Sequence, residues 1–275
     1  MSSIAVGAIR IDGASPTPPL HSLLSIPGVL QSGGRWEGGV NIWGYTADVP
    51  STWDACSVGT YRVKDEGEAV GSEGFASFII YVAQNCSTFG TASDLPGFAR
   101  RADAVLEATQ SFAVEEALAK GIDGLGNKFM GDSDLISLAT NVSPVVGLSY
   151  LENAIGATGR RGMVHLTPAV AAQLDSNLSD NGTGTLVTLA GNPVVVGGGY
   201  IGTDPTDEPS PDATHDWIFA TGPVEARVSE ILPGPGDISG MVDPETNEVI
   251  YRAEKLANVG WDGVLQVGVL VDWTP

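Results

Sequence analysis

The segment from Gly202 to Asp216 is rich in acidic residues. Carboxylates are the ligands that a hard cation such as calcium prefers. The acidic residues of this segment are Asp204, Asp207, Glu208, Asp212 and Asp216. A calcium ion needs about six to eight converging oxygens. The prolines of the segment, Pro205, Pro209 and Pro211, oppose the tight wrap of an EF-hand loop. We therefore interpret it as a solvated acidic loop rather than a metal site.

The three histidines lack the spacing of a metal or catalytic site. His165 lies between aliphatic residues in a predicted buried strand, so a core histidine with satisfied hydrogen bonds is favoured over a general base. His21 and His215 fall in predicted loops, without a His-x-x-x-His or His-Glu pattern. The histidines therefore predict neither a metal nor a proton-transfer role.

The two cysteines, Cys56 and Cys86, are not spaced for zinc. They flank a predicted hairpin, so a disulfide between them stays open. In a protein made in the cytoplasm we expect both thiols to be reduced and partly buried.

Two glycine-rich stretches have the composition, but not the context, of nucleotide-binding loops. Residues 121–126 follow a predicted helix rather than a strand, so the helix N-terminus that binds pyrophosphate is missing. Residues 197–199 follow a strand but lead toward the acidic loop, which would repel phosphate. The sequence has no Gly-x-Ser-x-Gly motif and no cysteine beside a candidate base. We predict that the chain is not an enzyme and uses no cofactor.

The chain is strongly acidic, with a formal net charge of −20 from 33 acidic and 13 basic residues. Such a surface repels nucleic acid and anionic lipid, so sequence-specific DNA binding is not expected. No segment approaches the roughly 20 apolar residues that cross a bilayer, so no membrane partner is expected either.

The first 50 residues have little periodic pattern and many prolines and glycines. Trp36 and Trp43 lie among them, and a disordered tail would rarely carry such aromatics. Two interpretations follow. Residues 1–50 are either an extended arm that packs on another molecule or an irregular segment folded on its own domain.

Residues 56–86 predict a projecting hairpin. Residues 59–64 alternate as a strand does, residues 71–74 are rich in turn formers, and residues 75–82 are a strongly β-prone return strand. The charged tip predicts a solvated loop.

The strongest helix spans residues 97–120, capped by Ser93 or Asp94 and ended by Gly121. Its predicted apolar stripe is Phe98, Ala102, Val105, Leu106, Thr109, Phe112, Ala113, Ala117 and Leu118. A second helix begins at Ser143 and Pro144, runs through Ile155, and stops at Gly156 and Gly159.

The rest of the chain alternates short strands with one more helix. The predicted elements are a strand at 162–166, a helix from Thr167 through Leu178, a hairpin of 185–189 with 193–196, and strands at 217–220 and 224–228. Two last strands, at 247–256 and 260–271, are joined by a short bend. The fold class is therefore α+β, with helices and antiparallel hairpins interleaved.

The order of these parts resembles the capsid fold that tailed bacteriophages and encapsulins share. Residues 154–168 (AIGATGRRGMVHLTP) and 220–227 (ATGPVEAR) resemble capsid-like proteins of phages of actinobacteria. The run Arg252-Ala253-Glu254 resembles the last strand pair of the family. Lys255 stands where the family commonly has Arg, which removes bidentate geometry from any ion pair there.

The resemblance implies a division of the chain into parts. Residues 1–50 would be an N-terminal arm, 51–95 an extended hairpin loop over a neighbouring subunit, 96–142 with 243–275 a peripheral domain carrying the spine helix, and 143–242 an axial domain. It implies a major capsid protein of a tailed bacteriophage, which assembles from hexamers and pentamers into an icosahedral shell around double-stranded DNA. Another virion structural protein of the vertex, neck or tail, or an encapsulin-like compartment shell, is the alternative.

The implied partners are copies of the chain itself, with scaffold, portal or decoration proteins, in a virion assembled in the host cytoplasm. The acidity then supports solubility or keeps enclosed DNA from adhering to the inner wall. The candidate interface residues are Trp36, Trp43, Phe75, Phe78, Tyr81, Arg100 and Arg101. For Phe75, Phe78 and Tyr81 the alternative is that they face their own core. The resemblance adds Lys64, because a lysine of this loop joins covalently to a neighbour in some phage capsids.

Overall fold

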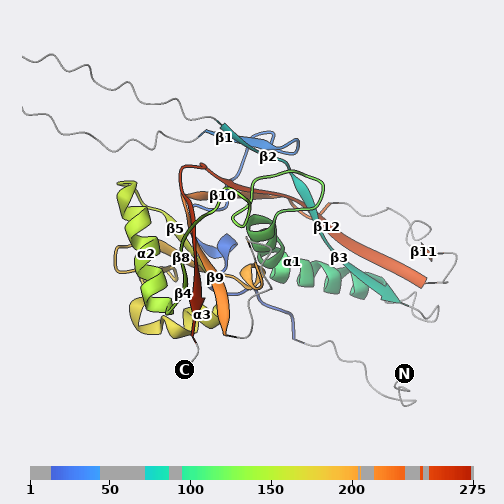
Figure 1. Ribbon diagram of the computed structural model, residues 1–275. Helices are drawn as coiled ribbons and strands as arrows, with labels where there is room; N and C mark the ends of the chain where they lie inside the picture. Colours follow the sequence, from blue (N-terminus) through green and yellow to red (C-terminus); the bar gives the residue numbers. More distant parts are fainter. Residues whose placement is uncertain are drawn as a thin grey trace, which may run out of the picture.

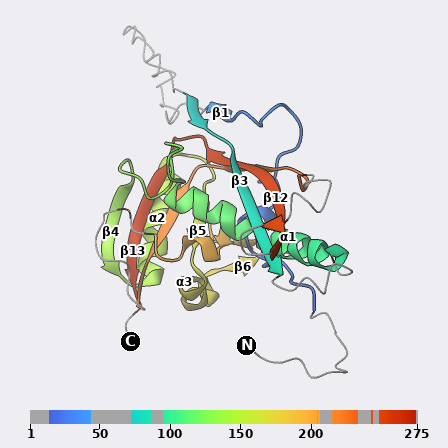
Figure 2. The same ribbon diagram turned by 90° about the vertical axis from the view of Figure 1, so that its right-hand side faces the viewer.

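The computed structural model describes residues 14–43, 72–86, 95–203, 205, 214–232, 242–243 and 248–273. They form two larger β-sheets, a two-stranded ribbon and a long helix, α1 (Leu95–Lys120). Figures 1 and 2 show α1 running beneath one larger sheet, while the other sheet stands beside it with its own helices. The α+β fold class is confirmed.

The spine helix α1 ends where the sequence predicts. Gly121 has a φ of +77° and its N–H bonds to the Ala117 carbonyl at 3.0 Å, which is a left-handed stop that glycine adopts at little cost. The predicted apolar stripe is partly wrong, because Thr109 and Phe112 are exposed. The buried face instead carries Ser111 and Glu115 beside the aliphatic residues. The caps predicted at Ser93 and Asp94 lie outside the described residues.

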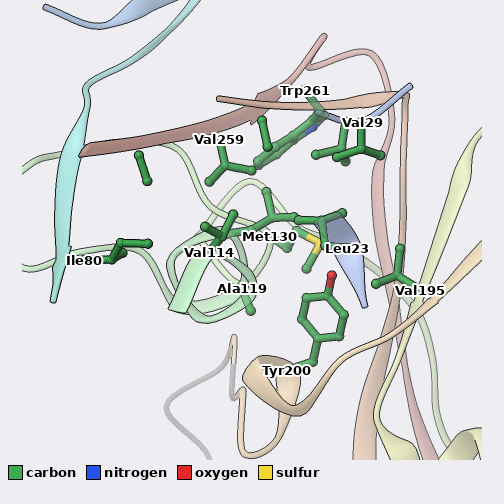
Figure 3. Packing of buried hydrophobic residues seen from close by; sticks show 14 of the residues in the cluster. Leu23, Val29, Ile80, Val114, Ala119, Met130, Val195, Tyr200, Val259 and Trp261 are labelled. Atoms are coloured by element: carbon green, nitrogen blue, oxygen red, sulfur yellow. The ribbon is translucent and has the colours of Figure 1, made fainter. Parts of the chain in front are cut away.

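The sheet over α1 is built around β12 (Glu248–Trp261). β3 (Phe78–Cys86) pairs antiparallel along one edge of β12, while β10 (Val224–Val228) and β11 (Val242–Asp243) pair along the other. Figure 3 shows the core between this sheet, α1 and the first described segment, in which Leu23, Val114 and Trp261 are all fully buried.

The second sheet has seven strands in the order β4-β13-β9-β5-β8-β7-β6. Their bounds are β4 Ile136–Val142, β5 Met163–Leu166, β6 Ser179–Asp180, β7 Leu186–Val187, β8 Pro193–Val196, β9 His215–Thr221 and β13 Gln266–Asp272. Two pairs, β4 with β13 and β5 with β8, are parallel, and the other pairs are antiparallel. Helix α2 (Pro144–Ala157) packs on β13, β4 and β9, and α3 (Pro168–Gln173) follows β5.

Several local predictions are confirmed. α2 begins at Pro144 as expected, passes through Gly156 and ends at Ala157, before Gly159 turns the chain with a φ of +67°. β5 is completely buried, and β7 pairs with β8 as the predicted hairpin. α3 is shorter than expected, because the chain tightens into a 3₁₀ turn at Asp175–Asn177.

The long-range pairing differs from the sequence interpretation. The last two strands, β12 and β13, do not pair with each other but belong to different sheets, as do β9 and β10. The turn expected at residues 71–74 is wrong, because β2 (Ser72–Phe75) is a strand that pairs with β1 (Val40–Trp43). β1 lies inside the segment for which no regular pattern was expected. Backbone pairing with distant partners decides these elements, and no local pattern encodes it.

Of the two interpretations of residues 1–50, folding on their own domain holds for residues 20–31. Leu23, Ile26 and Val29 enter the core. The Val196 N–H donates to the His21 carbonyl at 2.8 Å. A 3₁₀ turn, η1 (Leu23–Ser25), then leads to Val29, whose carbonyl accepts the Ala226 N–H at 2.9 Å. This segment therefore joins the two sheets, while residues 1–13 and 44–50 lie outside the described part.

The turn η4 (Gly198–Tyr200) packs so closely on α1 that Gly199 has no space for a side chain. A Cβ there would lie 2.5 Å from the Glu116 nitrogen and the Phe112 oxygen. We expect Gly199→Ala to lower the free energy of unfolding by about 1–3 kcal/mol, measured by urea denaturation. Gly156→Ala is the matched control, because its Cβ would meet nothing within 4 Å and alanine favours a helix by up to about 1 kcal/mol. Equal stability of the two variants would contradict the packing argument.

Candidate functional site

His165 is a buried, hydrogen-bonded core residue, as the sequence predicts. Its Nδ1 lies 3.0 Å from the Tyr200 hydroxyl and its Nε2 lies 2.9 Å from Thr221 Oγ1. Because the Thr221 hydroxyl donates to the Gly222 carbonyl at 2.8 Å, it accepts from Nε2–H, and Nδ1 accepts from Tyr200. Burial lowers the pKa of His165 to about 3, so the ring is neutral at pH 7. It has no access to a substrate and joins η4, β5 and β9.

Glu115 is a buried carboxylate on the spine helix, with 1% of its surface exposed. Its Oε1 accepts the Leu23 N–H at 2.9 Å and the Ser111 hydroxyl at 3.1 Å, and its Oε2 accepts the Gly199 N–H at 3.3 Å. Burial raises the pKa of Glu115, and these hydrogen bonds oppose the rise. Burial, with a smaller contribution from the Glu115 charge, raises the pKa of Tyr200 well above its usual value. Glu115 therefore fastens the first described segment and η4 to the spine helix.

Most of the acidic loop lies outside the described residues, but Asp216 is described and buried. Its Oδ1 accepts a hydrogen bond from the N–H of Trp217, the next residue in the chain, at 3.0 Å. Burial raises the pKa of Asp216. Among the described residues, no three His, Cys, Asp or Glu side chains are grouped to hold a metal ion.

Cys56 and Lys64 lie outside the described part of the chain, and the side chain of Cys86 is not described.

The glycine stretches serve turns and close packing. Residues 121–126 follow the C-terminal end of α1, as predicted. Gly197 sits against Glu115, whose Oε2 would lie 2.5 Å from a Cβ at that position. The run 197–199 therefore fits against α1 rather than around a phosphate.

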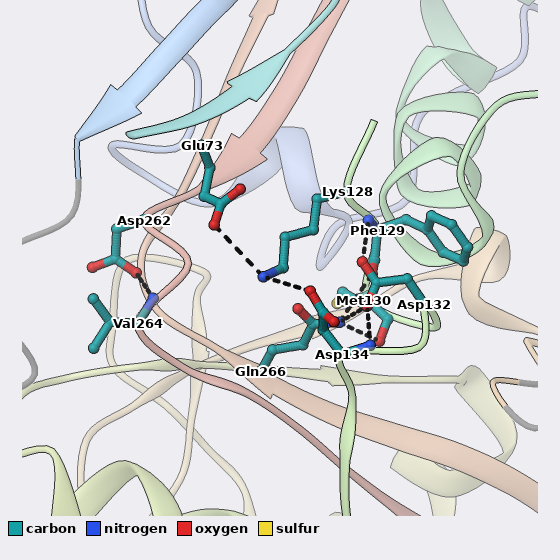
Figure 4. Close-up of polar contacts among 9 residues, drawn as sticks. All are labelled: Glu73, Lys128, Phe129, Met130, Asp132, Asp134, Asp262, Val264 and Gln266. Carbon is teal, nitrogen blue, oxygen red and sulfur yellow. Dashed lines mark hydrogen bonds and ion pairs between the residues drawn. The ribbon is translucent and has the colours of Figure 1, made fainter. Parts of the chain in front are cut away.

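The ribbon β1–β2 is fixed at its base by the loop that follows α1. The side chain of Asn127 hydrogen-bonds to both backbone groups of Ala76. Its Oδ1 accepts the Ala76 N–H at 2.8 Å, and its Nδ2 donates to the Ala76 carbonyl at 3.0 Å. Lys128 lies 3.8 Å from Glu73 on β2 and 3.6 Å from Asp134 (Figure 4). This base therefore has a defined orientation on the domain.

Gln266 fixes the same loop from the second sheet. Its Nε2 donates to the carbonyls of Phe129 and Met130 at 3.1 and 3.2 Å, and to Asp132 Oδ1 at 2.6 Å (Figure 4). The loop after α1 is thus held by β13 on one side and holds the ribbon on the other.

The candidate interface residues divide into buried and exposed sets. Phe75 and Phe78 face the core of their own chain, and Phe75 packs against Trp261 with ring centroids 5.6 Å apart. The interface prediction is therefore wrong for these two residues. Tyr81 and Trp43 are 64% and 71% exposed, since successive side chains of a strand point to opposite faces.

A groove of about 720 Å³ lies between β3 and the end of α1. Ile79 and Tyr81 line it from β3, and Ala117 and Leu125 line it from α1 and the loop beyond. The exposed aromatic ring of Tyr81 is thus part of an open, largely apolar surface.

The remaining candidate interface residues have partners in their own chain. Trp36 is half-buried, and its carbonyl accepts the Ser77 hydroxyl at 2.8 Å. Arg100 and Arg101, in the first turns of α1, line a hollow with Gln84 and residues 14–16, and both have interactions within the chain.

Lys255 is the buried cation of the sheet over α1. Its Nζ lies 2.7 Å from Glu107 and 3.0 Å from the Gln110 side-chain oxygen, both on α1. A single ammonium thus ties β12 to the spine helix without the bidentate geometry of an arginine.

Sequence reasoning missed Glu115 and Asn127. One feature of the sequence could have indicated Glu115. It is an acidic residue on the apolar side of the helix, four positions after Ser111 and three before Leu118. Asn127 left no signal, because its partner Ala76 is 51 positions away.

None of the described helices is long and apolar enough to cross a membrane. No family model matches the sequence, and no curated protein matches it. Solved structures do match. A structure from Gordonia phage Cozz aligns with a TM-score of 0.54 at 15% identity, over 100% of this chain and 92% of that chain. One from Mycobacterium phage Ogopogo aligns with a TM-score of 0.54 at 15% identity, over 99% and 96%.

A third structure is described as the gp27 major capsid proteins and gp26 decoration proteins of phage G. It aligns with a TM-score of 0.51 at 12% identity, over 98% of this chain and 94% of that chain. The chain therefore has the fold of these phage structures, among them the major capsid protein of phage G.

Proposed function

We propose that this chain is the major shell protein of a tailed bacteriophage and assembles into an icosahedral head around double-stranded DNA. The observation that carries the proposal is the capsid fold over essentially the whole chain, with 98–100% of it aligned. The buried polar residues support a structural role, because His165 and Glu115 are satisfied within the core rather than open to a substrate.

The proposal extends to the parts of the subunit. Residues 96–142 with 243–275 are the proposed peripheral domain around the spine helix and residues 143–242 the proposed axial domain, except that β10 joins the sheet over α1 and that β4 and β13 join the second sheet. Of residues 51–95, the part before β2 reaches over a neighbouring copy, while β3 stays in the sheet of its own chain. The contacts of Asn127 and Lys128 at the base support this role, because they would orient the segment. Residues 1–50 remain the arm, with residues 20–31 as its attachment to the subunit.

The proposed interface anchors are the exposed aromatic residues Trp43 and Tyr81, since large aromatic side chains dominate contact energies. Trp36, Arg100 and Arg101 complete the proposed set within the described residues. Lys64 is proposed as a contact of the projecting loop. The proposed partners are further copies in hexamers and pentamers, with scaffold, portal or decoration proteins, in the host cytoplasm and then the virion.

Sedimentation of the chain expressed with its virion partners tests the proposal. The expected result is a population of uniform large particles, whose DNA-filled forms are denser than the empty ones. Particles that never contain DNA would point to a compartment shell instead. Small oligomers under every condition, with or without partners, would reject the proposal.

We expect assembly to be favoured by moderate salt. Each copy carries a formal charge of −20, so copies that approach repel one another, and ions at about 0.15 M screen charges beyond roughly 8 Å. Light scattering at a fixed protein concentration should therefore rise when NaCl increases from about 10 to 150 mM. Scattering that falls steadily over this range would contradict the expectation.

A further inference from the structure

Helix α2 presents an uncharged face to solvent. Its exposed residues are Val145, Val146, Ser149, Tyr150, Asn153, Gly156 and Ala157. They lie opposite Leu148, Leu151 and Ile155, which pack on the second sheet. The helix has one charged residue, Glu152, and both of its carboxylate oxygens accept from Asn192 Nδ2 at 3.2 Å. No charged group of α2 therefore projects from this face.

This face is unusual for so acidic a chain. Val145, Val146 and Tyr150 are 48%, 42% and 43% exposed, although the protein has 33 acidic residues to place on its surface. Exposed apolar side chains that share one uncharged helix face on an otherwise charged protein are typical of a contact surface. α2 lies on the outer side of the second sheet, where another molecule can reach it (Figure 1).

The charges next to this face indicate the kind of partner. Arg160 and Arg161 follow the end of α2 and are exposed, and the charge of Arg160 acts on Asp262 of its own chain. They are two of only 13 basic residues. A positive charge such as that of Arg161 beside an uncharged face suits an acidic partner, and another copy of this chain, at −20, is such a partner.

The opposite edge of the same sheet has complementary features. β4, beside α2, and β6 are the two edge strands, with five strands between them. Asp175 and Asp180 are exposed at the β6 edge, and Leu189, after β7, is 92% exposed. A contact between two unlike edges repeats from copy to copy and closes a ring where the rotation permits.

We propose that the outward face of α2, from Val145 to Ala157, binds the β6–β7 edge of a second copy around Leu189, in a head-to-tail contact. The inference rests on the proposed function and names the surfaces through which copies meet. The apolar side chains of α2 cover Leu189, and Arg161 lies toward the carboxylates of the neighbour.

Two charge substitutions test the two surfaces separately. Val146→Asp alters the α2 face, Leu189→Asp alters the opposite edge, and Ile201→Asp is the control at a 55% exposed site on neither surface. All three sites are exposed, and circular dichroism verifies folding. We expect each of the first two variants to raise the concentration needed for assembly at least about tenfold, which corresponds to about 1.4 kcal/mol per contact. The control should assemble like the wild type.

An equimolar mixture of Val146→Asp and Leu189→Asp provides the sharpest readout. Each variant keeps one intact surface, so the mixture should form one-to-one pairs, seen by sedimentation, which cannot extend into rings or shells. Each variant alone should form no such pairs.

Three results would overturn the inference. One is assembly of either variant at the wild-type concentration. Another is a mixture that forms no pairs although the wild type assembles. The third is normal shells from Val146→Asp that no longer bind another virion protein, since α2 would then dock that protein. Failure of the wild type itself to assemble would instead reject the proposed function.

Discussion

Replacing Glu115 with alanine should lower the free energy of unfolding by about 3 kcal/mol or more. The substitution leaves the Leu23 N–H, the Gly199 N–H and the Ser111 hydroxyl without their acceptor inside the core. Each orphaned buried donor costs about 1–3 kcal/mol. The relief of removing a buried carboxylate offsets part of this loss, but not the loss of three partners at once.

Two further variants separate hydrogen bonding from general disruption. Glu115→Gln keeps one acceptor oxygen and should lose clearly less stability than Glu115→Ala. Glu116→Ala is the matched surface control. Its side chain is 47% exposed and pairs with Lys120 at 3.2 Å, so the loss should stay below about 1 kcal/mol. Urea denaturation measures all three variants.

Hydrogen exchange at Leu23 and Leu24 reports on the connection itself. It should accelerate in Glu115→Ala and not in Glu116→Ala. Equal losses of stability and equal exchange in the two alanine variants would contradict the role of Glu115.

Acidification from pH 6.5 to pH 4 should lower the free energy of unfolding by about 3 kcal/mol through His165. The ordinary pKa of 6.5 applies when the chain is unfolded, and burial lowers the pKa of His165 to about 3 in the folded protein. Between these two pKa values the His165 ring is protonated in the unfolded chain but not in the folded protein. The stability is fully present above pH 6.5 and is lost as the pH falls toward 3, at about 1.4 kcal/mol per pH unit.

Glu115 acts with the opposite sign. Burial raises its pKa, so the folded protein binds a proton more readily than the unfolded chain, and this group adds stability as the pH falls through its folded pKa. The two groups must therefore be separated by substitution.

His165→Gln isolates the histidine. A glutamine amide can still donate toward Thr221 and accept from Tyr200, but it does not titrate. We expect this variant to lose the histidine's part of the slope of stability against pH, while His21→Gln, at a site outside the core, keeps it. Urea denaturation at pH intervals from 7 to 4 measures the slopes. The same slope in His165→Gln and the wild type would contradict this account.

Local patterns in the sequence predicted the elements whose cause is local. The spine helix and its stop at Gly121, the start of α2 at Pro144, and the buried strand around His165 follow from periodicity, capping and composition. The interpretation of His165 as a satisfied core residue was confirmed for the same reason, since its aliphatic neighbours are in the sequence.

Pairing between distant segments explains the errors. β12 continues to Trp261 and pairs with β3 and β10, so the short bend before β13 separates two sheets instead of closing a hairpin. Ser72–Phe75 consists largely of turn formers but pairs with Val40–Trp43. Phe75 faces inward because Trp261 and Gly260 provide its site from 185 or more positions away. No local signal carries such information.

Electron cryomicroscopy of the assembled particles tests the central claim most directly. The account predicts an icosahedral lattice in which every hexamer and pentamer is made of this 275-residue chain, with α2 of each copy against the neighbouring copy. A shell built from a different protein, with this chain absent or bound only at isolated positions, would contradict it.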